Sequence, residues 1–389
     1  MKVLHLGFSK TGGAGVSAER LSNALNKIGV ESDFIYLKPY SRNIARIGWL
    51  EKKLNGIRNI LFSKVFRVGT INLFPSSLLR RINRSDADLI HLHWINAEML
   101  SIEQIPKIKK PLAWSFHDMW PICGSENIIY DQCFEGNTYE NMPGISGWTW
   151  RRKKRAWSNL TAQILCPSTW LAECVKQSQI FCNQAVDVLP NGLNLDVFKP
   201  ADRDSARLKC GFPLNKKLVL FGAADPRNFN KGGDLLRAAL ELLNTTDVEV
   251  AVFGADGDEK IAGLPTCWLG YIHDAEELAE LYSAADVVCV PSRVETFGQT
   301  ASEPQACGVP VVAFDTTGLK DVIEHKVTGY LATPFDVTDF ARGIEWVLGA
   351  DRGELSRNAR ERAERLFDEQ AIAKQCKKIY ERVLARAVV

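Results

Sequence analysis

Short runs of β-branched and apolar residues alternate with longer helical patterns along the whole chain of 389 residues. This alternation favours parallel sheets covered by helices on both faces, because consecutive parallel strands need a crossover connection. The length exceeds one ordinary domain and suits two domains of roughly 150–200 residues. We therefore predict an α/β protein with two doubly wound, Rossmann-like domains. The expected strands are 2–7, 32–37, 89–93, 112–116 and 164–167 in the first half, and 218–221, 248–253, 266–269, 287–291 and 309–314 in the second.

The segment 187–200 is the expected boundary between the two domains. It is rich in turn-forming residues and contains Pro190 and Pro200. The resulting N-terminal domain is 1–190 and the C-terminal domain 191–370. Because doubly wound domains bind ligands at the carboxyl ends of their strands, we expect the site to lie in a cleft between the domains.

Bulk composition excludes several classes of protein. The net charge is +2, so overall charge gives no indication of nucleic-acid binding. The N-terminal strand lacks the apolar core of a secretory signal, and no apolar run approaches 20 residues, so we expect a cytoplasmic protein without a membrane span. Cys123 and Cys133 bracket a loop, but two ligands are too few for a closed zinc site. Neither a metal nor a cofactor is expected.

Two glutamates eight positions apart, Glu295 and Glu303, carry the strongest functional signal. The run between them leaves an apolar strand and turns at Gly298 into a predicted helix, which places Glu295 on the turn and Glu303 about one turn inside the helix. The unpaired N–H groups of a helix start stabilise anions, so the two carboxylates would flank a bound phosphate. For a single glutamate, a solvated side chain or a helix cap is the alternative.

The same run continues into Ala306-Cys-Gly-Val-Pro-Val-Val312 and resembles the donor site of retaining, GT-B-fold family 4 glycosyltransferases. The resemblance implies that Glu295 approaches the transferred sugar and that Glu303 accepts hydrogen bonds from the ribose hydroxyls. It also implies a diphosphate held by the residues between them, which are Phe297, Gly298, Gln299 and Thr300.

A second segment of the C-terminal domain supplies cations. Arg227 and Lys231 precede a Gly-Gly pair at a predicted helix start, where they can neutralise a departing diphosphate. Lys231 resembles the phosphate-binding lysine of the family. The family commonly has an arginine where this chain has Ala223, and Arg227 is the candidate to replace it; a solvated surface pair is the alternative. The segment ending at Ile272 resembles the loop whose backbone contacts the nucleobase.

The N-terminal domain offers a Gly-rich turn and a histidine. Gly13 and Gly15 follow the first strand and are candidate backbone donors to the donor diphosphate or to the acceptor. The sequence His117-Asp-Met-Trp-Pro follows another strand and resembles members of the family that assemble colanic acid and other exopolysaccharides. The resemblance implies a sugar-contacting His117 and an orienting Asp118. His91 and His93 alternate along a strand and are expected to be structural.

These segments predict a retaining glycosyltransferase that moves a sugar from a UDP or GDP sugar to a glycan acceptor, lipid-linked, in polysaccharide or lipopolysaccharide assembly. The resemblance also implies that a final helix, about 371–389, crosses back to the N-terminal domain, which binds the acceptor. Two alternatives remain: a sugar-nucleotide epimerase or hydrolase of the same fold, and a non-catalytic subunit that binds nucleotide sugars.

Two basic segments are candidates for contact with an anionic membrane. Residues 42–84 contain ten Lys or Arg and one acidic residue, interleaved with apolar side chains, and residues 151–155 read Arg-Arg-Lys-Lys-Arg between two tryptophans. Such segments suit the surface of an anionic leaflet. A solvated face is the alternative.

Overall fold

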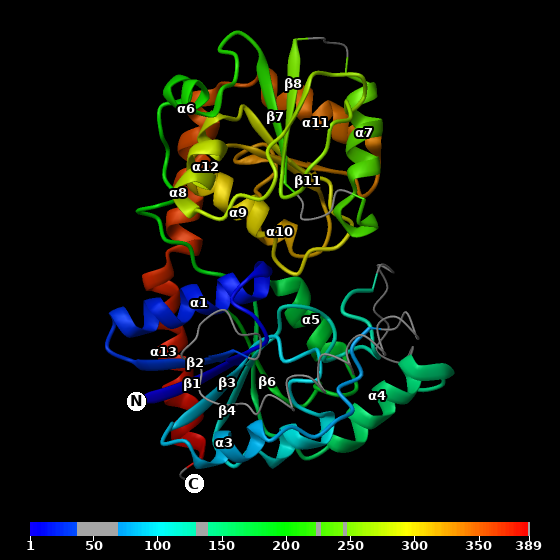
Figure 1. Cartoon of the computed structure of the whole chain (residues 1–389), viewed down its shortest axis with the longest axis vertical. Helices are drawn as coiled ribbons and strands as arrows, with labels where there is room; N and C mark the ends of the chain where they lie inside the picture. Colours follow the sequence, from blue (N-terminus) through cyan, green and yellow to red (C-terminus); the bar gives the residue numbers. More distant parts are fainter. Residues whose placement is uncertain (37–68, 130–138, 223–226, 244–246, 388–389) are drawn as a thin grey trace. The chain divides into compact units, whose positions relative to one another are not determined.

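The computed structural model describes residues 1–36, 69–129, 139–222, 227–243 and 247–387 (Figure 1). The chain divides into two compact units, one formed by Met1–Gly192 together with Gln370–Val389 and the other by Leu193–Glu369. Each unit is built on its own six-stranded sheet, and every strand pairs with its neighbours in parallel. The predicted pair of doubly wound, Rossmann-like domains is therefore confirmed.

The sheet of the first unit has the strand order β2-β1-β3-β4-β5-β6. Side chains on one face pack against helices α1 and α13, and those on the other face against α3, α4 and α5. The first face is lined by Val3, Leu89, Ala113 and Leu165, which alternate along their strands with the residues of the second face. The strands are β1 (Lys2–Gly7), β2 (Glu31–Tyr36), β3 (Leu89–Leu92), β4 (Leu112–Ser115), β5 (Gln163–Cys166) and β6 (Ala185–Val188); the helices are α1 (Gly12–Lys27), α3 (Leu78–Arg84), η1 (Ile102–Lys107), α4 (Gly144–Ala156), α5 (Thr169–Gln177) and α13 (Glu369–Ala387).

The sheet of the second unit has the order β12-β11-β10-β7-β8-β9. Its two faces form two separate apolar clusters, one with α6, α8, α9, α10 and the C-terminal part of α12 and the other with α7, α11 and Leu355 of α12. The strands are β7 (Lys217–Gly222), β8 (Val248–Phe253), β9 (Thr266–Trp268), β10 (Val287–Val290), β11 (Val311–Phe314) and β12 (Gly329–Ala332). The helices are α6 (Arg203–Cys210), η2 (Phe229–Lys231), α7 (Gly233–Glu241), α8 (Ala275–Ala284), α9 (Gln299–Ala306), α10 (Leu319–Val322), α11 (Val337–Gly349) and α12 (Arg352–Phe367).

Two edge strands, β6 and β12, were missing from the predicted set. Strand β6 lies at the edge of its sheet, and all four of its residues are only half-buried. Because such a strand needs no continuous apolar run, its sequence carries no clear signal. Strand β12 begins with Gly329, where an added methyl would lie 2.0 Å from the carbonyl oxygen of Val311. Glycine there allows the two strands to approach, but it also hides the strand from a propensity argument.

The final helix, α13, belongs to the first unit. Ile372, Cys376 and Tyr380 are buried on it against the sheet. Among the described residues, no helix combines the length and the apolar character needed to cross a bilayer.

Candidate functional site

The strand order of the second sheet reverses between β7 and β10. From this pair the chain continues outward through β8 and β9 on one side and through β11 and β12 on the other. In doubly wound sheets the loops that leave the carboxyl ends of such a pair form the usual ligand site. In this unit the two loops lead into α7 and α9, and they carry Lys231 and Glu295.

Lys231 and Glu295 contact each other at this reversal. The Lys231 Nζ atom lies 2.6 Å from Oε1 of Glu295, and Ser292 Oγ donates to the same oxygen at 2.9 Å. The backbone N–H of Glu295 donates to Thr317 Oγ1 at 3.1 Å, and its carbonyl accepts from the Gly318 N–H at 2.8 Å. The Lys231 side chain is 31% exposed and that of Glu295 15%, so a ligand can reach both.

A tight turn fixes Lys231 against the loop of Glu295. The Asn230 side chain donates to the carbonyl of Val294 at 2.9 Å and accepts from its N–H at 3.1 Å. Gly232 follows in the left-handed region at φ 66°, and a methyl on it would lie 2.0 Å from the carbonyl oxygen of Pro291. Gly232 is therefore needed for the turn to dock against the loop of Glu295.

Arg293 strengthens the same contact between the loops. Its guanidinium forms two hydrogen bonds with the Asp234 carboxylate, at 2.9 and 2.6 Å, and its Cζ lies 3.7 Å from the ring centroid of Phe229. Sequence reasoning missed Asn230, Ser292 and Arg293. Their only signal was adjacency to the predicted lysine and glutamate, because a polar residue in a loop is ordinarily solvated.

Helix α9 begins at the predicted position. Gly298 is its N-cap at φ 98°, and Gln299 and Thr300 form the first turn with half-buried side chains. The N–H groups at the first turn of a helix suit an anion. Phe297, in contrast, is only 2% exposed and meets Phe367 edge to face, so its part in binding would fall to its backbone.

Glu303 lies inside α9 and is buried, with 5% of its surface exposed. Its carboxylate accepts a hydrogen bond of 3.0 Å from the hydroxyl of Tyr282 on α8. A buried carboxylate with a hydroxyl partner has acceptor capacity left over for further donors. Its predicted part in holding the ribose stays a prediction.

Arg227 and Ile272 of the second unit have different surroundings. Arg227 is exposed and lines a pocket of about 400 Å³ with Glu259 and Trp268. Ile272 is half-buried against one apolar cluster of the unit. Ala223, where the family commonly has arginine, lies outside the described residues, so the substitution of Arg227 for that arginine stays a prediction.

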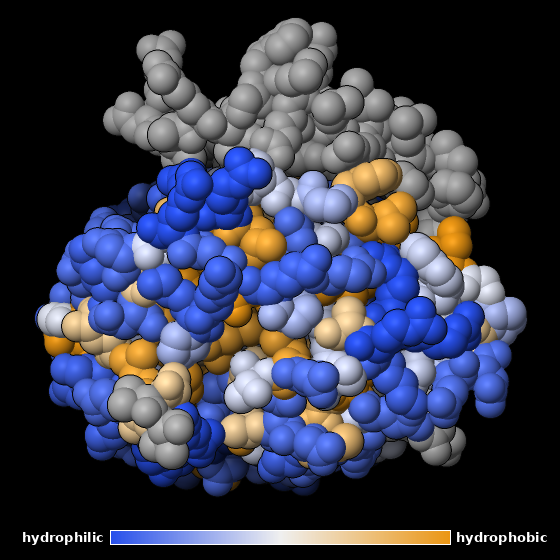
Figure 2. All heavy atoms as spheres, turned by 90° about the horizontal axis from the view of Figure 1, so that it is seen from below, coloured by the Kyte–Doolittle hydropathy of each residue, from blue (hydrophilic) through white to orange (hydrophobic). Residues whose placement is uncertain are grey.

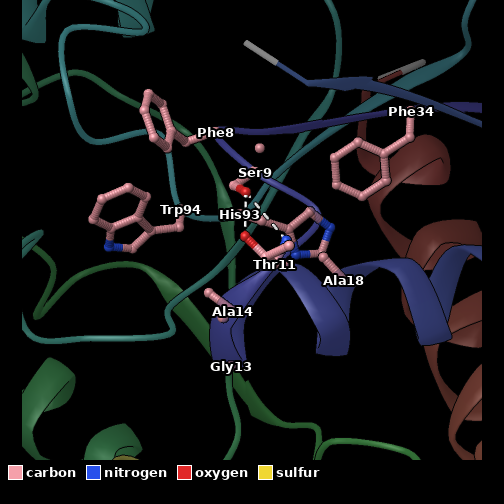
Figure 3. Close-up of a pocket in the computed structure, with 12 residues that line it drawn as sticks. Phe8, Ser9, Thr11, Gly13, Ala14, Ala18, Phe34, His93 and Trp94 are labelled. Atoms are coloured by element: carbon pink, nitrogen blue, oxygen red, sulfur yellow. Dashed lines mark hydrogen bonds between the residues drawn. The ribbon is translucent and has the colours of Figure 1, made fainter. Parts of the chain in front are cut away.

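The first sheet also reverses its strand order, between β1 and β3, and a pocket of about 370 Å³ lies there (Figure 3). The loop after β1 and the start of α1 form one wall, and Trp94 after β3 and Phe34 of β2 contribute aromatic rings. Gly13 is exposed, with no atom within 4 Å of an added methyl. Gly15 is buried, and a methyl there would lie 2.3 Å from the Ser9 carbonyl oxygen. Glycine at this position therefore lets α1 pack closely on the loop.

His117 and Asp118 follow β4 in the first unit. His117 Nε2 lies 3.0 Å from Nδ1 of His93, and burial lowers the pKa of His117 to about 4. Asp118 accepts from the indole N–H of Trp94 at 2.6 Å and from the backbone N–H of Trp120 at 3.0 Å. Burial nevertheless raises the pKa of Asp118 to about 6, because desolvation outweighs these donors.

His91 and His93 differ in their surroundings. His91 lies between the hydroxyls of Tyr380 and Ser115, at 2.6 and 2.8 Å, as expected of a structural residue. His93 bonds His117 and also lines the pocket of the first unit.

Potential metal ligands gather at one place within the described part of the chain. Ring nitrogens of His5, His91 and His93 lie within 4.8 Å of one another. Cys123 is buried, and burial raises the pKa of its thiol, which disfavours the thiolate that a metal needs. Cys133 lies outside the described residues.

Only part of the basic segments is described, since 42–68 lie outside the described residues. Arg80, Arg81 and Arg84 of α3 line an open pocket of about 650 Å³ together with Asp33 and Asp86. On the face seen in Figure 2, hydrophilic residues cover most of the described surface, with apolar residues in patches between them.

The run 151–155 is not uniformly solvated. Lys153 is buried and donates to the carbonyls of Trp120, Cys123 and Gly124. Its ammonium also lies 3.8 Å from the ring centroid of Trp120. One of the five basic residues thus belongs to the core of the first unit.

Two parallel, doubly wound units of six strands each define the GT-B class of fold. Residues 11–197 match the family described as Glycosyltransferase Family 4, and residues 202–366 match Glycosyl transferases group 1. The two matches leave unmatched only the two ends and a short join. The chain belongs to the GT-B glycosyltransferases, with a family 4 unit followed by a group 1 unit.

Curated relatives match part of the chain. The D-inositol 3-phosphate glycosyltransferase of Mycolicibacterium smegmatis is 38% identical over 193 residues, which are 46% of this chain and 43% of the relative. The protein of the same name from Mycobacterium bovis is 35% identical over 191 residues, 44% of this chain and 38% of the relative. The matched region thus spans less than half of these relatives.

Solved structures match the chain along almost its whole length. Sucrose-phosphate synthase from Thermosynechococcus elongatus superposes with a TM-score of 0.70 at 21% identity, covering 99% of both chains. Anabaena HepE in complex with UDP-glucose gives a TM-score of 0.69 at 18% identity, covering 98% of this chain and 99% of that one. At these identities the similarity is one of fold.

Proposed function

We propose that this protein transfers a sugar from a nucleoside diphosphate sugar to a glycan acceptor with retention of the anomeric configuration. The observation that supports this most is the Lys231–Glu295 ion pair of 2.6 Å, located where the strand order of the second sheet reverses and one short loop before the N-terminus of α9. A cation and a helix start together match a diphosphate leaving group, and Glu295 adds a carboxylate for the sugar it carries.

The second unit would stabilise the charge that develops on the leaving diphosphate. Lys231 and the N–H groups of Gln299 and Thr300 are already held in place by the surrounding loops, so little reorganisation is needed as the bond breaks. Preorganised charges of this kind supply much of the rate enhancement in many enzymes. A metal is not required for this step when a lysine and a helix start perform it.

Retention fits the composition of the first unit. An inverting transferase needs a carboxylate base beside the acceptor hydroxyl, and residues 8–15, most of which line the pocket after β1, contain no Asp or Glu. Anabaena HepE, which shares the fold, is in complex with UDP-glucose, so UDP-glucose is the first donor to test and GDP sugars are the second.

The acceptor is proposed to be a glycan in polysaccharide or lipopolysaccharide assembly, carried on a lipid. Trp94, Phe8 and Phe34 give the pocket of the first unit aromatic walls, against which the C–H faces of a sugar can pack. Arg80, Arg81 and Arg84 would draw this unit to an anionic leaflet. An inositol phosphate is the competing acceptor, because the curated relatives carry that name.

Product analysis tests the proposal. The purified protein would be incubated with UDP-glucose alone, with a lipid-linked oligosaccharide, and with inositol 3-phosphate, and the products identified by mass spectrometry and by NMR of the anomeric proton. An α-linked product formed only when acceptor is present supports a retaining transferase. Conversion of UDP-glucose without acceptor would instead indicate an epimerase or hydrolase, and nucleotide binding without turnover of any donor would indicate a binding subunit.

A cosedimentation experiment tests the proposed membrane contact. Vesicles of phosphatidylcholine alone and vesicles with added phosphatidylglycerol would be compared for the wild type and for a variant with Arg80, Arg81 and Arg84 changed to Ser. Binding that needs the anionic lipid and falls in the variant supports the contact. Equal binding to both kinds of vesicle contradicts it.

A further inference from the structure

Four histidines lie on the face of the first sheet that α1 and α13 cover. His5 on β1 is in register with His91 on β3, and His93 follows two residues later on the same face. His117 follows β4 two residues after Ser115, whose hydroxyl bonds His91. Three of the four are almost completely buried, with exposures of 0% for His5 and His91 and 3% for His93.

Three of these rings form a continuous chain of hydrogen bonds. His5 Nδ1 lies 2.9 Å from His93 Nε2, and His93 Nδ1 lies 3.0 Å from His117 Nε2. The planes of the bonded rings differ by 15° and 26°, with centroids 5.2 and 5.3 Å apart. Nearly parallel planes, nitrogens within hydrogen-bond distance and such wide centroid spacing together describe rings joined edge to edge, not face to face.

A bound metal accounts less well for this cluster. Of the six ring nitrogens of His5, His91 and His93, five already have a hydrogen-bond partner, and only His5 Nε2 lacks one among the described residues. A zinc ion would sit about 2.0–2.1 Å from each ligating nitrogen, with the rings directed at one centre. The rings of His5 and His93 instead direct nitrogens at each other.

The chain of bonds has one direction. Burial lowers the pKa of His5 and of His117 to about 3 and about 4, and that of His93 well below its ordinary value, so all three rings are neutral at pH 7. A neutral imidazole has one N–H, which is a donor, and one bare nitrogen, which is an acceptor. Consequently, if His5 donates to His93, then His93 must donate to His117.

The unpartnered end of the chain selects that direction. His5 Nε2 is buried and has no partner among the described residues. Buried N–H groups without an acceptor are rarer in proteins than buried acceptors without a donor. His5 therefore carries its proton on Nδ1, and so do His93 and His117 in turn.

We infer that His5 and His93 are positioning residues that hold His117 in the tautomer protonated on Nδ1, so that His117 presents an N–H donor to an oxygen of the transferred sugar. The inference rests on the proposed function and on the prediction from the sequence that His117 contacts that sugar. It gives a reason for the two buried histidines: the N–H of His5 fixes the tautomer of His93, and the N–H of His93 fixes that of His117. A site that donates to a sugar oxygen disfavours a sugar in which that oxygen is missing.

Nitrogen-15 NMR of histidine-labelled protein tests the tautomer without any substrate. Long-range proton–nitrogen correlations distinguish a protonated ring nitrogen from a bare one, and His117→Gln assigns the signal. The wild type at pH 7.5 should show His5, His93 and His117 all protonated on Nδ1. Protonation of His117 on Nε2, or stoichiometric zinc found by elemental analysis with loss of these bonds, would overturn the inference.

Variants at the far end of the chain separate positioning from packing. His5→Asn retains a donor near the place of Nδ1, whereas His5→Leu fills similar space without one. The Leu variant should lose the single tautomer at His117 and show a fall in kcat of about tenfold, the size of one lost hydrogen bond in the transition state, with little change in the donor KM. The Asn variant should keep the tautomer and most of the rate.

His325→Gln, on an exposed residue of the second unit, serves as the matched control and should change neither property. An unaltered His117 tautomer in a folded His5→Leu protein would overturn the inference even if the transferase activity is present. If the tautomer is as stated but no donor is turned over by the wild type, the proposed function fails and the tautomer assignment stands.

Discussion

The Lys231 ammonium and the Glu295 carboxylate form an ion pair of 2.6 Å, although 64 positions separate them in the sequence. Each comes from a loop at the reversal of the second sheet, and the Asn230 amide and the Arg293–Asp234 pair hold the two loops together. We propose that Lys231 exchanges this carboxylate for the diphosphate when the nucleotide binds. The two residues are therefore expected to have opposite effects on nucleotide binding.

Lys231→Ala should weaken UDP binding, and Glu295→Gln should not. Loss of a charged hydrogen-bond donor is worth about 1.5–3 kcal/mol, so the Kd of UDP should rise roughly 10- to 100-fold in the first variant. The second variant releases Lys231 from its partner, so its Kd should stay equal or fall, while turnover drops by orders of magnitude. Isothermal titration calorimetry with UDP measures both constants.

The matched control is Lys209→Ala, which removes an exposed lysine that also pairs with a glutamate at 2.6 Å. Its Kd for UDP should equal that of the wild type. Equal weakening by Lys231→Ala and Glu295→Gln would contradict the exchange of partners and favour a purely structural ion pair.

Gly232→Ala should destabilise the second unit and reduce turnover together. A methyl at this residue meets the carbonyl oxygen of Pro291 at 2.0 Å, and its φ of 66° is strained for alanine. The turn must move away from the loop of Glu295, at a cost of about 1–3 kcal/mol. Differential scanning calorimetry and steady-state kinetics measure the two effects.

Gly349→Ala is the control for this change. Gly349 ends α11, and no atom lies within 4 Å of its added methyl. It should alter neither the melting temperature nor kcat appreciably. A Gly232→Ala protein with wild-type stability and turnover would show that the tight turn is not needed to place Lys231.

Local patterns predicted the fold because they depend on neighbouring residues. The alternation of strands and helices, the turn at Gly298 and the start of α9 can all be deduced from a few consecutive positions. The edge strands β6 and β12 could not, since β6 is half-buried throughout and β12 begins with a glycine, so that neither short strand carries a clear apolar pattern.

Long-range pairings were beyond such reasoning. Asn230 and Val294 are 64 positions apart, and His5 and His93 are 88 apart. In the sequence His93 has the appearance of an ordinary strand residue, and only the register of β1 with β3 brings it next to His5. A residue whose partner comes from another strand is identified by topology, not by motif.

Glu303→Gln should reduce the preference of the second unit for a nucleotide with ribose hydroxyls. Glu303 accepts from the Tyr282 hydroxyl, and a carboxylate has enough lone pairs to accept from ribose hydroxyls as well, so a nucleotide without these hydroxyls loses those bonds. The wild type should bind UDP more tightly than 2′,3′-dideoxy-UDP by roughly 10- to 100-fold, and the variant by much less. Competition titration of the two nucleotides gives the ratio. Tyr282→Phe, which leaves the carboxylate in place, should keep most of the preference; an unchanged ratio in Glu303→Gln would contradict the ribose contact.

Acidification below pH 6.5 should destabilise the first unit, because its buried histidines are neutral in the folded protein. Burial lowers the pKa of His5 and His117 to about 3 and about 4 and that of His91 and His93 well below the ordinary value of 6.5. Below pH 6.5 the unfolded chain therefore binds more protons than the folded one, and each histidine removes about 1.4 kcal/mol of stability per pH unit until its folded pKa is reached. Asp118 acts in the opposite sense, because its pKa is raised to about 6 and its protonation favours the folded state between that value and 3.8.

The histidines outnumber this one carboxyl group, so the free energy of unfolding should fall steeply from pH 6.5 to pH 5 and be nearly constant above pH 7.5. Urea titrations followed by tryptophan fluorescence report on the first unit, because residues 1–192 contain eight of the ten tryptophans. His5→Leu should make the slope between pH 6.5 and 5 shallower by about 1.4 kcal/mol per pH unit, whereas His325→Gln, at an exposed position, should leave it unchanged. A flat profile in the wild type would mean that the buried histidines are already charged in the folded protein, and the chain of neutral imidazoles from His5 to His117 would then be wrong.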